Sequence, residues 1–274
     1  MDIGQPGSYL LRVFDTNKQR SVEPYVLSTR FTPAIDRNRM NWTAELATPL
    51  APVHQTSQTS DVVRAALLPR GDNDFYRLTT PVAGEWRVTL TEEPGGMTLN
   101  TGVYRSPSGN WLPDMSPKGD GQLLVDLASP GDYFLQINDA NKTSSTEAYE
   151  LNWEFTPAAD RHEPNYQPEL ASMIDAQGTI RAAILPKGDK DHYQFDIDKP
   201  QRWRVSIDNQ PDLMNLSVGV YPAPSGNWLL DQSPKGDGQL LVDLPHAGRY
   251  ILVVSDANGN RSPESYQIST QFVQ

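Results

Sequence analysis

The chain contains no cysteine, which excludes disulfide bonds, thiolate metal sites and a cysteine nucleophile. It is also poor in positive charge: 23 Lys and Arg residues stand against 34 Asp and Glu residues, a formal net charge of −11. We therefore expect no nucleic-acid partner, because a duplex binder needs a basic surface that displaces counterions. No run approaches the roughly 20 apolar residues of a membrane span, so we expect no membrane insertion.

The most informative feature of the sequence is an internal repeat. The segment 106–127, SPSGNWLPDMSPKGDGQLLVDL, returns at 223–244 as APSGNWLLDQSPKGDGQLLVDL, at an offset of 117 residues. Upstream, the Asp-Arg pair at 36–37 recurs at 160–161, where the offset is 124. The first copy therefore contains seven extra residues, which we place in the polar run 54–60 because surface loops tolerate insertions at small entropic cost.

A third, partial copy opens the chain. Residues 7–13, GSYLLRV, match 131–137, GDYFLQI, and the Phe-Thr-Pro triplet at 31–33 recurs at 155–157. The sequence is thus expected to begin inside a repeat, with the last two strands of a preceding domain. The expected units are this partial repeat and two complete β-sandwich domains: 1–33, 34–157 and 158–274.

Two isolated strands are marginally stable in water. We therefore expect the apolar side chains of the partial repeat to pack on the first complete domain, or to pair with another molecule at an exposed edge. The side chains concerned are Leu10, Val13, Tyr25 and Leu27.

Each repeat is expected to consist of short strands. Apolar and polar residues alternate with period two in 193–197 (YQFDI) and 203–207 (WRVSI), the pattern of a half-buried strand. Turn clusters such as 233–238 (SPKGDG) separate the strands. The sequence therefore predicts an all-β fold of tandem antiparallel jelly-roll-like β-sandwiches, with about seven or eight strands per repeat. The best helix signal, at 167–173, amounts to a single turn.

An ordered signature runs through the second repeat: HEPN at 162–165, GDKDHYQF at 188–195 and GRY at 248–250. It resembles the bacterial pre-peptidase C-terminal (PPC) domain, whose pattern is written loosely as EPN…GDxDxYxF…GxY. The first repeat retains GDNDFYRL at 71–78 and GDY at 131–133. The resemblance implies a jelly-roll-like sandwich with a non-catalytic role in binding, spacing or secretion. It also implies an extracytoplasmic location, in a secreted, periplasmic or cell-surface bacterial protein.

We accordingly expect a non-catalytic tandem module that serves as a spacer or interaction domain of a larger bacterial protein. Its expected partners are other domains of that protein and a glycan or an extracellular protein. Two alternatives stay open: a module that binds a glycan or protein ligand, and a secretion or maturation appendage of a peptidase. An enzyme is not expected, because a duplicated catalytic site would keep its base and none of the four histidines recurs in the other repeat.

The resemblance further implies a calcium site in the second domain. Related collagen-binding domains ligate calcium with carboxylates ahead of the first strand and in the GDxD-like turn, as hard cations take oxygen ligands. The first domain has Arg39 where the second has Glu163, and a cation at a ligand position opposes a bound ion. The alternative is that the aspartates only cap their turn through backbone N–H bonds. The matching residues are Glu163, Asn165, Asp189 and Asp191.

The loop SGNWL is the second candidate site. Between 108–127 and 225–244, 18 of 20 residues are identical, although loops normally diverge faster than the strands around them. Each tryptophan is interpreted either as a platform for a sugar ring or peptide, or as a plug that closes one end of its sandwich. Solvent exposure of the two rings separates these interpretations. The candidate ligand-binding residues are Asn110, Trp111, Lys118, Asn227, Trp228 and Lys235.

Overall fold

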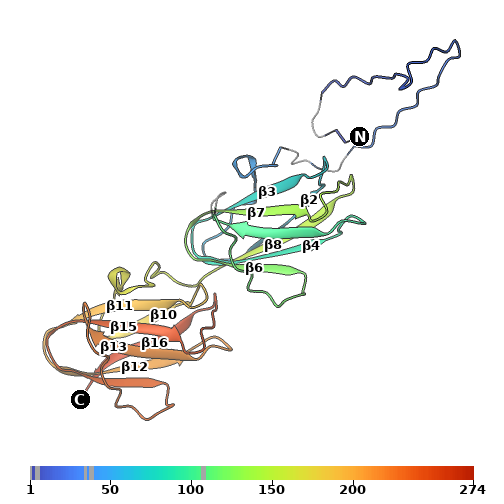
Figure 1. Cartoon of the computed structure of the whole chain (residues 1–274). Helices are drawn as coiled ribbons and strands as arrows, with labels where there is room; N and C mark the ends of the chain where they lie inside the picture. Colours follow the sequence, from blue (N-terminus) through green and yellow to red (C-terminus); the bar gives the residue numbers. More distant parts are fainter. Residues whose placement is uncertain (1, 4–6, 34–35, 37–39, 106–108) are drawn as a thin grey trace.

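The computed structural model describes residues 2–3, 7–33, 36, 40–105 and 109–274. Two β-sandwiches of eight strands each lie end to end (Figure 1). Both have the same order of elements, so the predicted all-β fold with internal recurrence is confirmed. Among the described residues, no helix has the length and apolar character of a membrane span.

The first sandwich starts with a 3₁₀ turn, η1 (Ala44–Leu46). Its strands form two four-stranded sheets, in the orders β1-β3-β7-β5 and β2-β8-β4-β6. Consecutive strands always lie in opposite sheets, which gives the jelly-roll-like connectivity that the sequence predicts. The strands are β1 (Thr48–Pro49), β2 (Thr59–Ala65), β3 (Asn73–Thr80), β4 (Gly84–Thr91), β5 (Leu99–Tyr104), β6 (Gln122–Leu127), β7 (Gly131–Asp139) and β8 (Tyr149–Pro157).

The second sandwich repeats this plan after the 3₁₀ turn η2 (Pro168–Leu170), the single helical turn expected near that position. Its sheets have the orders β13-β15-β11-β9 and β10-β16-β12-β14. Pairing is antiparallel except for the two-residue parallel pairs β1–β3 and β9–β11, where the entering chain adds at a sheet edge before it crosses over. The strands are β9 (Ser172–Met173), β10 (Gly178–Ala182), β11 (Lys190–Ile197), β12 (Gln201–Asn209), β13 (Leu216–Pro222), β14 (Gln239–Leu244), β15 (Gly248–Asp256) and β16 (Tyr266–Val273).

Each sandwich encloses one apolar core between its two sheets. The alternation read in β11 turns Tyr193 and Phe195 inward, and both are fully buried. Trp203 of β12 is also fully buried and stacks on Phe195 with 4.3 Å between ring centroids. Trp86 occupies the equivalent place in the first core. Packing in these cores fixes the positions of the inward-facing side chains on the strands.

The two sandwiches meet through an ion-paired and hydrogen-bonded joint. Arg261 Nη1 lies 2.6 Å from Glu85 Oε2 and 2.8 Å from Asp126 Oδ1, and all three side chains are largely buried. The second oxygen of Asp126 accepts a hydrogen bond from the backbone N–H of Lys187 (2.9 Å). An apolar patch completes the joint, formed by Ala83, Ala158, Ala183 and Leu185. Side-chain contacts therefore hold the second sandwich against the first, in addition to the covalent link between them.

The described residues 2–3 and 7–33 form no strand, and the segment extends away from the first sandwich as a long open loop (Figure 1). The expectation that its apolar side chains pack on the first domain is wrong, because all four are exposed. The two-strand remnant does not form here because these segments lack partner strands to satisfy their backbone groups. Their membership of a further repeat stays a prediction.

Candidate functional site

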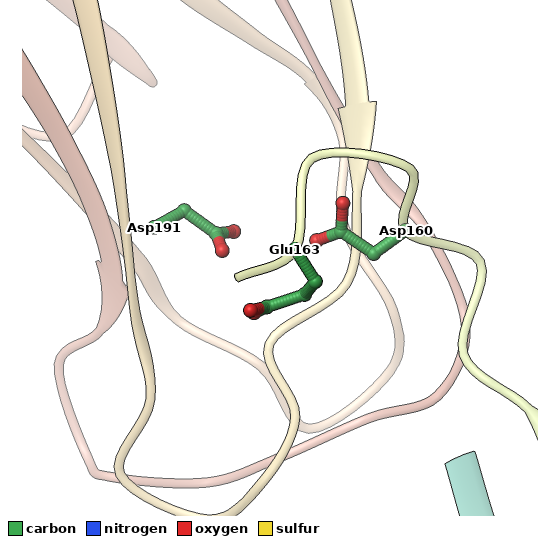
Figure 2. A group of neighbouring side chains, drawn as sticks. All are labelled: Asp160, Glu163 and Asp191. Atoms are coloured by element: carbon green, nitrogen blue, oxygen red, sulfur yellow. The ribbon is translucent and has the colours of Figure 1, made fainter. Parts of the chain in front are cut away.

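Four carboxylates converge at the start of the second sandwich. Asp160 and Glu163 lie on the segment between β8 and η2, Asp189 lies in the turn before β11, and Asp191 lies in β11 itself. Strand alternation turns Asp191 inward, and the segment after β8 folds back over it. One carboxylate oxygen each of Asp160, Glu163 and Asp191 lies within 4.8 Å of the others (Figure 2).

Several buried oxygens in this cluster have no hydrogen-bond donor among the described residues. Asn165 is 0% exposed, and its side-chain Oδ1 is one of them. The others are Oδ1 of Asp191, Oε1 of Glu163 and Oδ2 of Asp189. A buried acceptor without a donor costs about 1–3 kcal/mol, so such oxygens are rare in folded proteins. A cation bound by oxygen would satisfy all four.

Burial raises the pKa of each carboxyl in the cluster, and repulsion from neighbouring carboxylates adds to the effect at Glu163, Asp189 and Asp191. Burial raises the pKa of Glu163 to about 8, and the neighbouring charge of Asp189 adds to the effect. Burial likewise raises the pKa of Asp189 to about 6. It raises the pKa of Asp160, and it raises the pKa of Asp191 well above its ordinary value, where the charge of Asp160 contributes. A divalent cation between such carboxylates stabilises their ionised forms, which burial and the neighbouring charges otherwise disfavour.

Protein donors hold one oxygen of Asp191 and both oxygens of Asp160, whose Oδ1 accepts a hydrogen bond from the backbone N–H of His162 at 2.7 Å. Tyr266 donates its hydroxyl proton to Asp191 Oδ2 at 2.5 Å. Asp160 Oδ2 accepts a hydrogen bond from the backbone N–H of Ala183 at 3.1 Å. The cluster is thus held from the core side by β16 and from the joint side by the end of β10.

The structure brings together all four residues that the PPC resemblance assigns to calcium, and it adds Asp160. The sequence-based set missed Asp160, although the recurrence of the Asp-Arg pair at 36–37 and 160–161 was a signal for it. Turn capping, the alternative, accounts for Asp189 Oδ1, which accepts a hydrogen bond from Lys190 N (2.7 Å), and for Glu163 Oε2, which accepts one from Asn165 N (3.1 Å). Capping leaves the oxygens without donors unexplained. The bound ion itself stays a prediction.

The first sandwich keeps part of this arrangement. Asp74 Oδ2 accepts a hydrogen bond from the Tyr149 hydroxyl, as Asp191 does from Tyr266. Burial raises the pKa of Asp72 to about 6 and that of Asp74 well above its ordinary value. Arg39, the residue that opposes a bound ion here, lies outside the described residues.

Both candidate tryptophans are half exposed: Trp111 by 52% and Trp228 by 61%. Each ring lies against a strand glycine, Gly102 in β5 or Gly219 in β13, where a Cβ atom would collide with the indole. Trp228 also meets Tyr221 edge to face, with 4.9 Å between ring centroids. Each indole is therefore packed on one side and open to solvent on the other, which favours a platform over a buried plug.

A groove of about 410 Å³ opens beside Trp228 on the outer face of the sheet β13-β15-β11-β9. The predicted companions Asn227 and Lys235 are exposed but do not line it, and Asn110 and Lys118 are exposed in the first sandwich. The polar residues of the groove, which the sequence-based set missed, face outward because Asp191 faces inward on the same strand. Its lining includes Lys190, His192, Ser217, Tyr221, Trp228 and Ser255.

No family model and no curated protein matches the chain. Among solved structures, the chain is similar to the pre-peptidase C-terminal domain of a collagenase from Bacillus anthracis, at 16% identity over 37% of this chain and 94% of that chain, with a TM-score of 0.31. It is also similar to the CUB1-EGF-CUB2 domains of human MASP-1/3, at 10% identity over 78% of this chain and 99% of that chain, with a TM-score of 0.23.

A third similarity is to the M60 catalytic domain with two CBM51 domains of Clostridium perfringens ZmpB, at 11% identity over 77% of this chain and 34% of that chain, with a TM-score of 0.23. A PPC domain, the family that the sequence resembles, is thus among the solved structures to which the chain is similar. The fold assignment itself rests on the strands and sheets described above.

Proposed function

We propose that the chain is a non-catalytic, extracytoplasmic module of a larger bacterial protein, a rigid spacer and interaction domain whose joint is fixed by calcium. The observation that carries the proposal is the convergence of Glu163, Asp189, Asp191, Asp160 and the buried Asn165 between the linking segment and β11. A cation there ties the linking segment to the core of the second sandwich.

The donor set suits calcium. All the candidate ligand atoms are oxygens, and Ca²⁺ takes six to eight oxygen ligands in flexible geometry. Mg²⁺ demands a near-ideal octahedron and keeps several waters, which suits a crowded cluster of protein carboxylates less well. When bound, the ion supplies positive charge that offsets the repulsion among Glu163, Asp189 and Asp191.

Asp160 connects this centre to the joint between the sandwiches. Asp160 accepts its hydrogen bond from the N–H of Ala183, and Ala183 packs in the apolar patch with Ala83 of the first sandwich and with Ala158, the first residue after β8. Holding Asp160 in place therefore holds the end of the second sandwich against the first. Calcium sites of extracellular modules bind with dissociation constants of roughly 10⁻⁴–10⁻³ M, so such a joint stiffens outside the cell.

Two of the four histidines, His162 and His192, make structural contacts, which supports a non-catalytic role. His192 Nδ1 lies 3.1 Å from the backbone oxygen of Asn165 and 3.0 Å from that of Lys190. His162 packs edge-on against Tyr193 with 5.3 Å between ring centroids. Neither imidazole is paired with a nucleophile in these contacts.

Thermal unfolding of the full chain with chelator and with calcium tests the proposal. Calcium at 100 times its dissociation constant should add about 2.7 kcal/mol to the free energy of unfolding. Glu163→Gln should lose this gain, because it removes one ligand charge while keeping the shape. Glu169→Gln is the matched control, since Glu169 is exposed and lies outside the cluster. An unchanged midpoint of the parent chain up to about 10 mM calcium would reject the proposal.

A second candidate function, ligand binding, is favoured by the half-exposed indoles and the groove beside Trp228. Soluble oligosaccharides and extended peptides, titrated while indole fluorescence is followed, would test it. If the groove is the stronger site, Trp228→Ala should remove more of the response than Trp111→Ala. A flat titration with every probe rejects this function. The appendage interpretation has no structural observation in its favour and stays a prediction.

A further inference from the structure

One end of the first sandwich repeats the chemistry by which the second sandwich joins the first. At the repeat offset of 117 residues, Arg70 is the counterpart of Lys187, and Ser144 is the counterpart of Arg261. In the joint between the sandwiches, Lys187 N donates a hydrogen bond to Asp126 (2.9 Å), and Arg261 pairs with the same carboxylate (2.8 Å). The end of the second sandwich that contains Lys187 and Arg261 therefore binds a carboxylate of its neighbour.

Asp2 supplies the same group to the first sandwich. Arg70 N donates a hydrogen bond to Asp2 Oδ2 at 3.2 Å, and Ser144 Oγ donates one to the same oxygen at 2.6 Å. The offset of 124 residues between the partial repeat and the first complete repeat matches Asp2 with Asp126. The second repeat has Asp243 at this place. The same carboxylate thus recurs in the sequence and binds equivalent donors in the structure.

The apolar part of the joint also recurs, but without its cover. Leu185 is 1% exposed and packs with Ala83 of the first sandwich and with Ala158, the first residue after β8. Its counterpart Leu68 is only partly buried, and Pro69 next to it is exposed. The end of the first sandwich covers Leu185, whereas no described sandwich covers Leu68.

We propose that the surface formed by Leu68, Arg70 and Ser144 docks a further β-sandwich of this repeat. The partner is the sandwich that residues 2–33 complete, and it docks in the orientation in which the first sandwich meets the second. Asp2 is its anchoring carboxylate. The exposed apolar side chains of residues 7–33 then belong in that partner's own core. Successive sandwiches thereby stack through one repeated joint, and each contacts its neighbours alone.

Amide hydrogen exchange in the full chain, followed by NMR, tests the anchoring contact directly. Asp2→Ala should speed exchange at Arg70 N by roughly fivefold, the factor expected for one lost hydrogen bond, and should leave Lys187 N unchanged. Asp126→Ala is the matched variant: it should speed exchange at Lys187 N and leave Arg70 N unchanged. An Arg70 amide that exchanges equally in Asp2→Ala and the parent chain overturns the proposal.

A lengthened chain tests the docking itself. Residues 34–125 placed directly ahead of Asp2, with the rest of the chain retained, would complete the partial repeat with the chain's own sequence. Residues 8–33 should then become protected from exchange, and small-angle scattering should show three sandwiches in one rod. Asp2→Ala in this chain should free the added sandwich without unfolding it.

Several outcomes would overturn the proposal. Residues 8–33 that stay unprotected in the lengthened chain show that they do not complete a sandwich. An added sandwich that folds but tumbles independently in NMR relaxation shows that it does not dock on Leu68 and Arg70. Concentration-dependent self-association of the original chain, abolished by Leu68→Asp, shows that a second copy of the chain takes the surface instead.

Discussion

Tyr266 donates a hydrogen bond to one oxygen of Asp191 at 2.5 Å, while the other oxygen, Oδ1, has no donor among the described residues. The tyrosine is buried and its own hydroxyl lies 2.7 Å from that of Tyr193, so the carboxylate is held from within the core. This assigns different tasks to the two oxygens of Asp191. Oδ2 is fixed by the protein, and Oδ1 is left for the cluster that Asp160 and Glu163 complete.

Tyr266→Phe should therefore weaken calcium binding without removing a ligand. Loss of a group that orients a metal ligand typically lowers metal affinity by about 10–100-fold. Calorimetric titration of calcium into the full chain measures the change. Tyr149→Phe is the matched control, because Tyr149 makes the same contact with Asp74 in the first sandwich. Equal losses in the two variants would show a general effect on stability rather than one on the site.

Without calcium, the chain should become less stable as pH rises. The pKa of Glu163 is raised from 4.5 to about 8 in the folded state. Between these values the folded state keeps a proton that the unfolded state has released, so the free energy of unfolding falls with rising pH. Asp189 acts in the same direction between 3.8 and about 6.

Thermal midpoints of the full chain in chelator, taken near pH 5 and near pH 8, check this prediction. The midpoint near pH 8 should be the lower one, and Glu163→Gln should reduce the difference. Added calcium should also reduce it, because the ion binds the ionised carboxylates. A midpoint that rises with pH in chelator would contradict the assignment of raised pKa values to this cluster.

Gly219→Ala should expose Trp228. The indole lies against Gly219, so a Cβ atom there would force the ring away and break its edge-to-face contact with Tyr221. We expect a red-shifted indole emission, stronger quenching by acrylamide and a loss of roughly 0.5–1.5 kcal/mol from the aromatic contact. Gly102→Ala should likewise force the Trp111 ring away and increase its quenching. Unchanged quenching in both variants would show that the rings do not rest on these glycines.

The sequence predicted the strands best where the chain alternates. The segments 193–197 and 203–207 lie in β11 and β12, because the pleat of a strand imposes a period of two on any face that packs against a core. The recurrence of whole blocks likewise predicted two similar sandwiches. Alternation does not encode which strands become neighbours, so sheet order and the parallel pairs came from the structure.

The candidate sites likewise contain residues that a local motif predicts and residues that only the fold brings together. Glu163 and Asp191 were predicted because they belong to a motif with a fixed order, whereas Asp160 lies in a loop without periodicity. The groove beside Trp228 was missed for a different reason. Pairing places Ser255 opposite both Lys190 and Ser217, so three strands distant in the sequence form one row of polar side chains. No local pattern carries that information.

Arg261→Ala should uncouple the two sandwiches. The change leaves Asp126 buried without its cation and leaves Glu85 with Arg87, 3.4 Å away. Burial already raises the pKa of Asp126, although Arg261 opposes this. Removing one partner of a buried ion pair costs about 3–5 kcal/mol when the other charge cannot reach water. Here the carboxylates regain water if the joint opens, so the cost should appear as undocking while each sandwich stays folded.

NMR relaxation of the full chain distinguishes these outcomes, because undocked sandwiches tumble faster and independently of each other. Arg249→Ala is the matched control: Arg249 pairs with Asp196 at 2.9 Å on the surface, where an ion pair contributes about 0–1 kcal/mol. That variant should tumble like the parent chain. If Arg261→Ala also tumbles like the parent, the apolar patch around Leu185 holds the joint without the ion pair. The repeated carboxylate contact would then orient the sandwiches rather than bind them.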